Sequence, residues 1–160
     1  TTFRIEHALW GLYPAGYHWV NIALHIANAL LLWRLLWRLQ IPGAWLAGAI
    51  FALHPVQVES VAWITERQNV LMGFFFLLTL LSWLEFAEDE SRRRWRFYAL
   101  ALMFYALALF SKTTACTLPA ALLLIFWLKG KAITRERLMQ IAPFVVLGLA
   151  MGLVSIWWER

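Results

Sequence analysis

Long apolar runs separated by short polar segments dominate this sequence. A helix that crosses a membrane needs about 20 mostly apolar residues. Runs near this length predict helical spans near residues 17–38, 39–54, 68–85, 97–111, 113–128 and 138–158, after an outer loop at 1–16. Pro42 and Pro55 weaken the second span, because proline disfavours a helix interior. The pattern therefore predicts an all-α fold, a polytopic bundle of about six transmembrane helices in which residues 1–160 form part of one membrane domain.

The apolar stretch 97–128 is divided into two spans because of its length and its single charge. Its 32 residues would form one rod of about 48 Å, too long for a hydrocarbon core of about 30 Å. One long span would also place Lys112 near mid-membrane, at a cost of about 3 kcal/mol. Two helices that meet near Ser111 and Lys112 avoid both problems.

The composition points to lipid as the main solvent. Hydrophobic residues make up 62% of the chain and charged residues 14%, and a soluble domain of this size has too little interior for so much apolar surface. The 11 tryptophans fit membrane–water boundaries. The net charge of +5 does not indicate nucleic acid as a partner, because the basic residues form short clusters between apolar runs, which suits loops beside lipid headgroups.

The basic residues also predict an orientation. Ten of them fall in alternate loops and four in the others, and the positive-inside rule assigns the larger set to the cytoplasm. Both ends of the chain then lie outside, as six crossings require. The charged run 85–96 is expected to be a solvated cytoplasmic connector. The chain is expected to be an internal piece of a longer integral membrane protein.

A stripe of polar residues marks the first span. His18, Asn21, His25 and Asn28, with Tyr17 beside them, share one helical face. Polar groups inside a bilayer face a partner helix or a wet cavity. We expect hydrogen bonds between helices here, and a divalent metal is the lesser alternative because asparagine is a poor ligand for transition metals. No other cofactor is indicated.

A second polar group follows the second span. The stretch from His54 to Asn69 contains Glu59 and Arg67 and is expected at the outer edge of the bilayer. Fixed charges there would lie within reach of a lipid headgroup. The alternative is an ordinary interfacial loop with an exposed ion pair. Lys112, at the predicted outward turn, suits a phosphate because it is a compact charge with three donors, although it could also simply extend to the interface.

Three stretches resemble a known family. They read FRIEHALWGLYPAGYHWVNIALH at 3–25, ALHPVQVESVAWITERQNVLMG at 52–73 and SKTTACTLP at 111–119. They are similar to the membrane portion of the tetratricopeptide-repeat O-mannosyltransferases and their bacterial relatives, within the C-type, polyprenyl-phosphate-sugar-dependent glycosyltransferases. The resemblance covers nearly the whole chain and corresponds to the end of a first large outer loop and helices two to seven.

The resemblance implies transfer of a mannose-like sugar from a polyprenyl-phosphate donor to a protein or glycan acceptor on the extracytoplasmic side. The membrane would be a bacterial inner membrane, or that of the endoplasmic reticulum in a eukaryote. In such enzymes an acid of the first outer loop usually activates the acceptor, and that loop is expected to lie mostly upstream of Thr1. The sequence departs from many relatives at Asn69, where they carry an acid.

The residues present suit this chemistry. Displacing a sugar from a phosphate needs a base for the acceptor hydroxyl and positive charge for the departing phosphate. Glu59 is the candidate catalytic base or orienting acid. The candidate substrate-binding residues are Arg4, Arg67 and Lys112 for the phosphate, and His18 and His54 for the sugar or headgroup.

Two other classes share these features. A transporter or flippase for an anionic lipid would also need buried polar helices and outer basic residues. A noncatalytic membrane scaffold subunit is the third possibility. The absence of a visible internal repeat favours the enzyme over the transporter.

Overall fold

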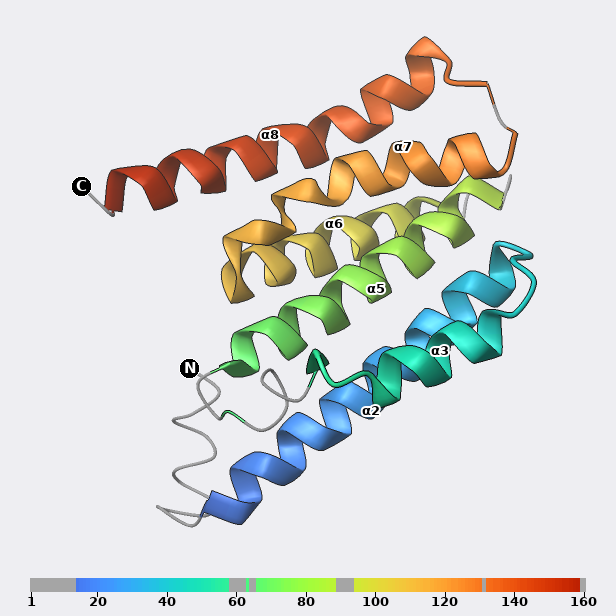
Figure 1. Cartoon of the computed structure of the whole chain (residues 1–160). Helices are drawn as coiled ribbons and strands as arrows, with labels where there is room; N and C mark the ends of the chain where they lie inside the picture. Colours follow the sequence, from blue (N-terminus) through green and yellow to red (C-terminus); the bar gives the residue numbers. More distant parts are fainter. Residues whose placement is uncertain (1–13, 58–62, 64–65, 89–93, 131, 159–160) are drawn as a thin grey trace.

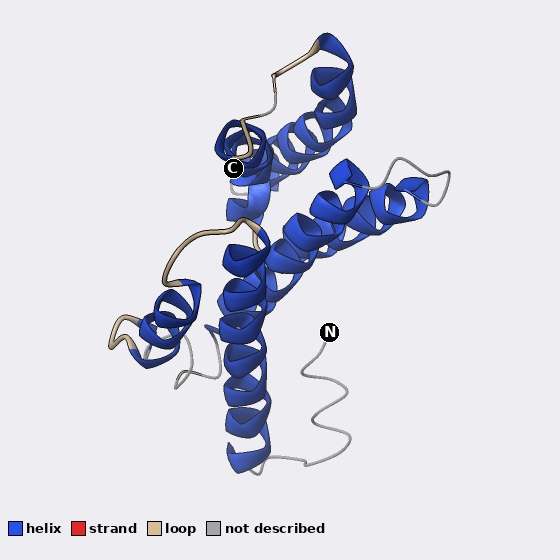
Figure 2. Ribbon diagram, turned by 90° about the vertical axis from the view of Figure 1, so that its right-hand side faces the viewer, coloured by secondary structure: helices blue, strands red, loops and turns tan. Residues whose placement is uncertain are grey.

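The computed structural model describes residues 14–57, 63, 66–88, 94–130 and 132–158, and all regular structure in them is helical (Figure 2). The elements are α2 (Pro14–Arg38), α3 (Ala44–Leu53), α5 (Arg67–Glu88), α6 (Arg94–Ser111), the 3₁₀ helix η2 (Thr113–Thr117), α7 (Leu118–Leu128) and α8 (Arg135–Trp158). This confirms the all-α prediction. Three helices, α2, α5 and α8, are long and apolar enough to cross a membrane.

Consecutive helices run in alternating directions, so their ends gather at two poles (Figure 1). We call one pole the Arg67 end: α2, α5 and η2 begin there, and α6 and α8 end there. The opposite pole is the Arg38 end, where α2, α5 and α7 end and α3, α6 and α8 begin. The helices α2 and α3 form one pair, α5 and α6 another, and α8 packs on η2 and α7.

Helix boundaries follow the apolar runs except in α3. The helix α6 ends at Ser111, Lys112 is extended, and η2 begins at Thr113, which is the break expected from the sequence. The helix α3 is shorter than the predicted span 39–54. Pro42 and Gly43 delay its start, and Gly43 adopts φ 76°, a left-handed conformation that only glycine adopts without steric cost. The number of membrane crossings stays a prediction.

Aromatic rings fill the core between four helices. The indole of Trp83 on α5 is fully buried, and its centroid lies 5.4 Å from Phe86, 6.1 Å from Tyr98, 5.8 Å from Phe126 and 5.4 Å from Phe144. Tyr98, Phe126 and Phe144 belong to α6, α7 and α8. Such pairs contribute about 0.5–1.5 kcal/mol each beyond the burial of their area. The cluster therefore joins α5–α8 near the Arg38 end.

Ion pairs join three helices at the Arg38 end. The guanidinium of Arg38 donates from Nη1 to Glu85 Oε1 and from Nη2 to Glu88 Oε2, both at 2.5 Å. Lys129, directly after α7, donates from Nζ to Glu88 Oε1. The expectation of a purely solvated connector from residue 85 was therefore wrong for these two acids, because α5 continues to Glu88 and carries them beside α2 and α7. The side chains remain partly exposed, so each pair contributes modestly.

Candidate functional site

The polar stripe of α2 faces its neighbours and forms hydrogen bonds with their backbone. Asn21, His25 and Asn28 are all at least nine-tenths buried. Their donors reach three carbonyl oxygens: Asn21 Nδ2 to Trp63 at 3.3 Å, His25 Nε2 to Ala52 at 3.1 Å, and Asn28 Nδ2 to Val70 at 2.8 Å. This confirms the expectation of hydrogen bonds between helices. His18 is half-buried one turn away, and its contact with a sugar or headgroup stays a prediction.

The hydrogen bond from His25 also shows where α3 ends. The last carbonyls of a helix have no partner within the helix, and His25 supplies one to Ala52. The imidazole also stacks on Phe51 at 5.3 Å. His25 is 11 residues after Pro14, about 16 Å along α2. The chain therefore leaves helical geometry beside the middle of α2, one helical turn from Asn21, which binds Arg67.

Arg67 begins α5 and fixes it against α2. Its side chain is buried, at 2% exposure. Nε donates to Asn21 Oδ1 and Nη2 donates to the carbonyl oxygen of Tyr17, both at 2.9 Å, and the guanidinium lies 5.9 Å from the centre of the Tyr17 ring. At least these two donors bind protein atoms, so Arg67 has a positioning role whatever its contact with a ligand.

Lys112 belongs to a polar chain that connects the α6–η2 junction with α5. The half-buried ammonium donates to Asn69 Oδ1, and Asn69 Nδ2 donates to Glu66 Oε2 at 2.5 Å. Our sequence reasoning gave no role to Glu66 and left that of Asn69 open. Their i, i+3 spacing at the start of an apolar run places them on one side of the first helical turn, which is a signal that could have found them. An amide at position 69 accepts from the ammonium with one atom and donates to the carboxylate with the other.

The remaining candidates are placed differently. His54 is exposed, and its Nδ1 accepts a hydrogen bond from the backbone N–H of Val56 at 3.2 Å, which closes the turn after α3. Arg4 and Glu59 lie outside the described residues, so their roles stay predictions. Within the described ranges, no group of three His, Cys, Asp or Glu side chains could hold a metal ion.

An open apolar groove lies beside this polar chain. It has a volume of about 450 Å³. It is lined by Asn28, Leu32, Phe51, Met72, Gly73, Phe76, Leu77, Thr114 and Thr117. Thr114 and Thr117 on η2 mark its side nearest Lys112, and the α5 residues continue away from the Arg67 end. The Oδ1 atom of Asn28 is buried and accepts no hydrogen bond from the part of the chain that the structure describes.

Helices long and apolar enough to cross a bilayer, with polar side chains turned toward one another, define an all-α integral membrane protein. Residues 4–158 match the model of the dolichyl-phosphate-mannose-protein mannosyltransferases, and the chain belongs to this family. This match and the relatives below confirm the resemblance to O-mannosyltransferases that the three sequence stretches suggested.

Its relatives include proteins named protein O-mannosyl-transferases. Tmtc2 of Drosophila melanogaster is 31% identical over 156 residues, which covers 92% of this chain and 16% of the relative. TMTC2 of Mus musculus is 40% identical over 101 residues, 61% of this chain and 12% of the relative. The chain therefore spans less than a fifth of the length of either relative. No solved structure matches it.

Proposed function

We propose that the full-length protein containing this chain is a multi-pass membrane glycosyltransferase. It transfers a mannose-like sugar from a polyprenyl-phosphate donor to a protein or glycan acceptor on the extracytoplasmic side. The observation that carries the proposal is the hydrogen bond from Lys112 to Asn69 of α5, at the same pole as Arg67, together with an apolar groove whose wall includes Thr114, two residues after Lys112. Membership of the mannosyltransferase family and the names of the relatives support the reaction class.

The arrangement suits a donor with a charged head and an apolar tail. An ammonium near the mouth of the groove offsets the charge of the donor phosphate, and the groove along α5 accommodates the isoprenoid chain. In the reaction, the acceptor hydroxyl oxygen bonds to the anomeric carbon while the bond from that carbon to the phosphate oxygen breaks. The hydroxyl proton passes to a carboxylate, and the phosphate leaves with the bonding electrons. Lys112 binds the donor phosphate in our proposal, both before and while this bond breaks.

Two carboxylates of the full-length protein are candidates to act on the acceptor hydroxyl. An acid of the outer loop that precedes this chain acts as the principal base, and Glu59 orients or deprotonates the acceptor. The segment that contains Glu59 connects the turn at His54 with Arg67, so both of its ends belong to the site.

The short length of α3, ten residues, supports a wet site. Non-helical backbone at membrane depth is tolerated only where protein buries it or where it lines a water-filled cavity. The chain after Leu53 meets this condition if it borders a recess open toward the Arg67 end. Such a recess admits a hydrophilic acceptor without exposing it to lipid.

The test is a transfer assay on the purified full-length protein in lipid vesicles. The sugar donor is polyprenyl-phosphate mannose, and the assay measures mannose attached to an added acceptor polypeptide. We expect transfer that depends on Glu59 and Lys112. Movement of the intact donor across the bilayer without any transfer would contradict the proposal and favour the transporter hypothesis.

A further inference from the structure

A second groove lies on the opposite side of α2, near the Arg38 end. Five residues of one helical face line an open cavity of about 530 Å³, at i, i+3, i+4, i+7 and i+8: Leu30, Trp33, Arg34, Trp37 and Arg38. Leu30 and Trp33 also line a neighbouring cavity of about 320 Å³ between α2 and α3. The two cavities adjoin at Leu30 and Trp33, and we call them together the Trp33–Arg34 groove.

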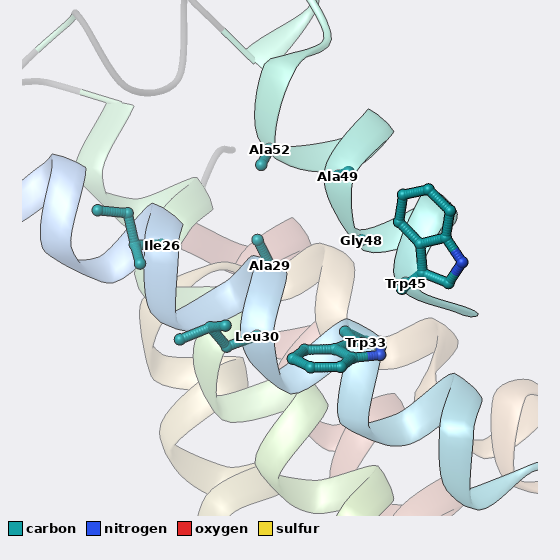
Figure 3. Close-up of a pocket in the computed structure, with 8 residues that line it drawn as sticks. All are labelled: Ile26, Ala29, Leu30, Trp33, Trp45, Gly48, Ala49 and Ala52. Atoms are coloured by element: carbon teal, nitrogen blue, oxygen red, sulfur yellow. The ribbon is translucent and has the colours of Figure 1, made fainter. Parts of the chain in front are cut away.

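The α2–α3 part of this groove is lined by apolar side chains (Figure 3). Its α3 wall consists of Gly48, Ala49 and Ala52 with the larger Trp45 at one end. A Cβ atom at Gly48 would lie 3.0 Å from Trp33 Cβ and 3.3 Å from the carbonyl oxygen of Ala29, so the helices approach closely there. Small residues beyond this contact leave a slot of the kind that a hydrocarbon chain fills.

Arg34 differs from its neighbour Arg38 in its partners. Arg38 is bound by Glu85 and Glu88. Arg34 is exposed, and no hydrogen bond or ion pair joins it to any other residue within the described ranges. It also lies one helical turn further from the end of α2. A guanidinium in this position must extend toward the headgroups or bind an anion that reaches down to it.

Three tryptophans place the groove at a membrane boundary. Trp33, Trp37 and Trp45 are 46%, 63% and 65% exposed, and Trp33 and Trp45 lie near one another at one end of the α2–α3 slot (Figure 3). Indole rings favour the headgroup level of a bilayer. The groove thus begins at headgroup level with a cation and continues into the membrane as an apolar slot.

We propose that the Trp33–Arg34 groove binds an anionic glycerophospholipid from the leaflet at the Arg38 end. The lipid phosphate binds Arg34, and one acyl chain lies between α2 and α3. Apolar contact alone would not select a lipid, because bulk lipid is as apolar as the groove. Selection comes from the unpaired charge of Arg34, and a single arginine at the surface favours an anionic headgroup by about fivefold. This site is independent of the sugar-transfer reaction.

The experiment uses full-length protein in phosphatidylcholine nanodiscs that contain a trace of a photoactivatable lipid. Phosphatidylglycerol and phosphatidylcholine with the same diazirine-labelled chains are compared, and the labelled residues are located by mass spectrometry. We expect labelling of α2 and α3 at the groove, stronger with phosphatidylglycerol by about fivefold. Arg34→Gln is expected to remove this preference and Arg34→Lys to retain most of it.

Two further variants separate the groove from general charge effects. Arg96→Gln removes an exposed cation at the same pole but outside the groove, so the preference should persist. Ala49→Phe fills the slot, so labelling should fall for both lipids while the protein retains its elution profile. Equal labelling by both lipids in the unmodified protein would overturn the proposal. Absence of any labelling at the groove would also overturn it, since other helices of the full-length protein would then cover this face.

Discussion

Arg67 Nε donates a hydrogen bond to Asn21 Oδ1 at 2.9 Å. Residues 14–33 of α2 contain no Asp, Glu, Lys or Arg. The bond joins the first residue of α5 to the first half of α2. It also explains why an asparagine occupies a helix that is otherwise mostly apolar.

Replacing Arg67 with lysine should separate its positioning role from ligand binding. An ammonium cannot supply the two donors that reach Asn21 and Tyr17 from separate nitrogens, so Arg67→Lys should destabilise the protein by about 1.5–3 kcal/mol. Thermal unfolding in detergent measures this, with Arg96→Lys as the exposed control. An unchanged melting temperature with weaker binding of polyprenyl-phosphate mannose would instead favour Arg67 as a direct phosphate partner.

Removing the ammonium of Lys112 should affect binding more than turnover. If its contact with the phosphate is mostly uniform binding, Lys112→Ala should raise the KM for polyprenyl-phosphate mannose, with a smaller fall in kcat at saturation. Lys112→Arg should restore part of the affinity because it restores the charge. A fall in folded yield with unchanged kinetics would show that Lys112 only holds η2 to α5 through Asn69.

Glu59→Gln should lower turnover. The amide keeps the shape of the side chain and removes its charge, so kcat should fall by about 10²–10⁴-fold while donor affinity changes little. Glu136→Gln is the control, because Glu136 is an exposed acid at the Arg38 end and outside the proposed site. Near-normal turnover of the Glu59 variant would leave the upstream loop as the sole source of the catalytic acid.

Two glycines of α8 give a matched test of helix packing. A Cβ atom at Gly148 would lie 2.5 Å from the hydroxyl of Tyr105, and the rigid ring has to move to admit it. Gly148→Ala should therefore destabilise the protein by about 1–3 kcal/mol. Gly152 has no atom within 4 Å of its Cβ position, and Gly152→Ala should be neutral or slightly stabilising. Equal unfolding temperatures for both variants would contradict the packing of α8 on α6.

The sidedness of the two poles can be measured with single cysteines. Cys116 is exposed near the Arg67 end and Ile133 is exposed near the Arg38 end. In a full-length protein otherwise free of cysteine, Cys116 should react with an impermeant thiol reagent from outside, whereas Ile133→Cys should react only after permeabilisation. The reverse pattern would move the proposed site to the cytoplasmic side.

Apolar run length predicted most helix boundaries because it acts through local physics. The break at Lys112 followed from one charge and the thickness of a bilayer, and the end of α2 near Arg38 followed from the return of polarity. The end of α3 at Leu53 also agrees with the prediction, whereas its start at Ala44 is later than predicted, because run length does not register the turn at Pro42 and Gly43.

Contacts between side chains on different helices could not be predicted from the sequence, because the partners are far apart along the chain. The spacing of the α2 stripe predicted a shared face but could not show that Asn28 binds Val70 on α5. Glu85 and Glu88 were predicted to be solvated, because the neighbouring sequence does not show that Arg38 and Lys129 lie beside them. Asn69 read as a departure from a family pattern, whereas in the structure it connects Lys112 with Glu66.

The ten residues of α3 rise only about 15 Å, about half the hydrocarbon thickness of a bilayer. Their outward side chains, among them Trp45, Leu46 and Ile50, are exposed and apolar. Lipid that borders such a short helix must thin or tilt its chains, at a fraction of a kcal/mol for each ångström of hydrophobic mismatch. Thin membranes reduce this strain, and the membrane of the endoplasmic reticulum is a few ångströms thinner than the plasma membrane. Bilayer thickness is thereby one physical influence on where a protein with this helix resides.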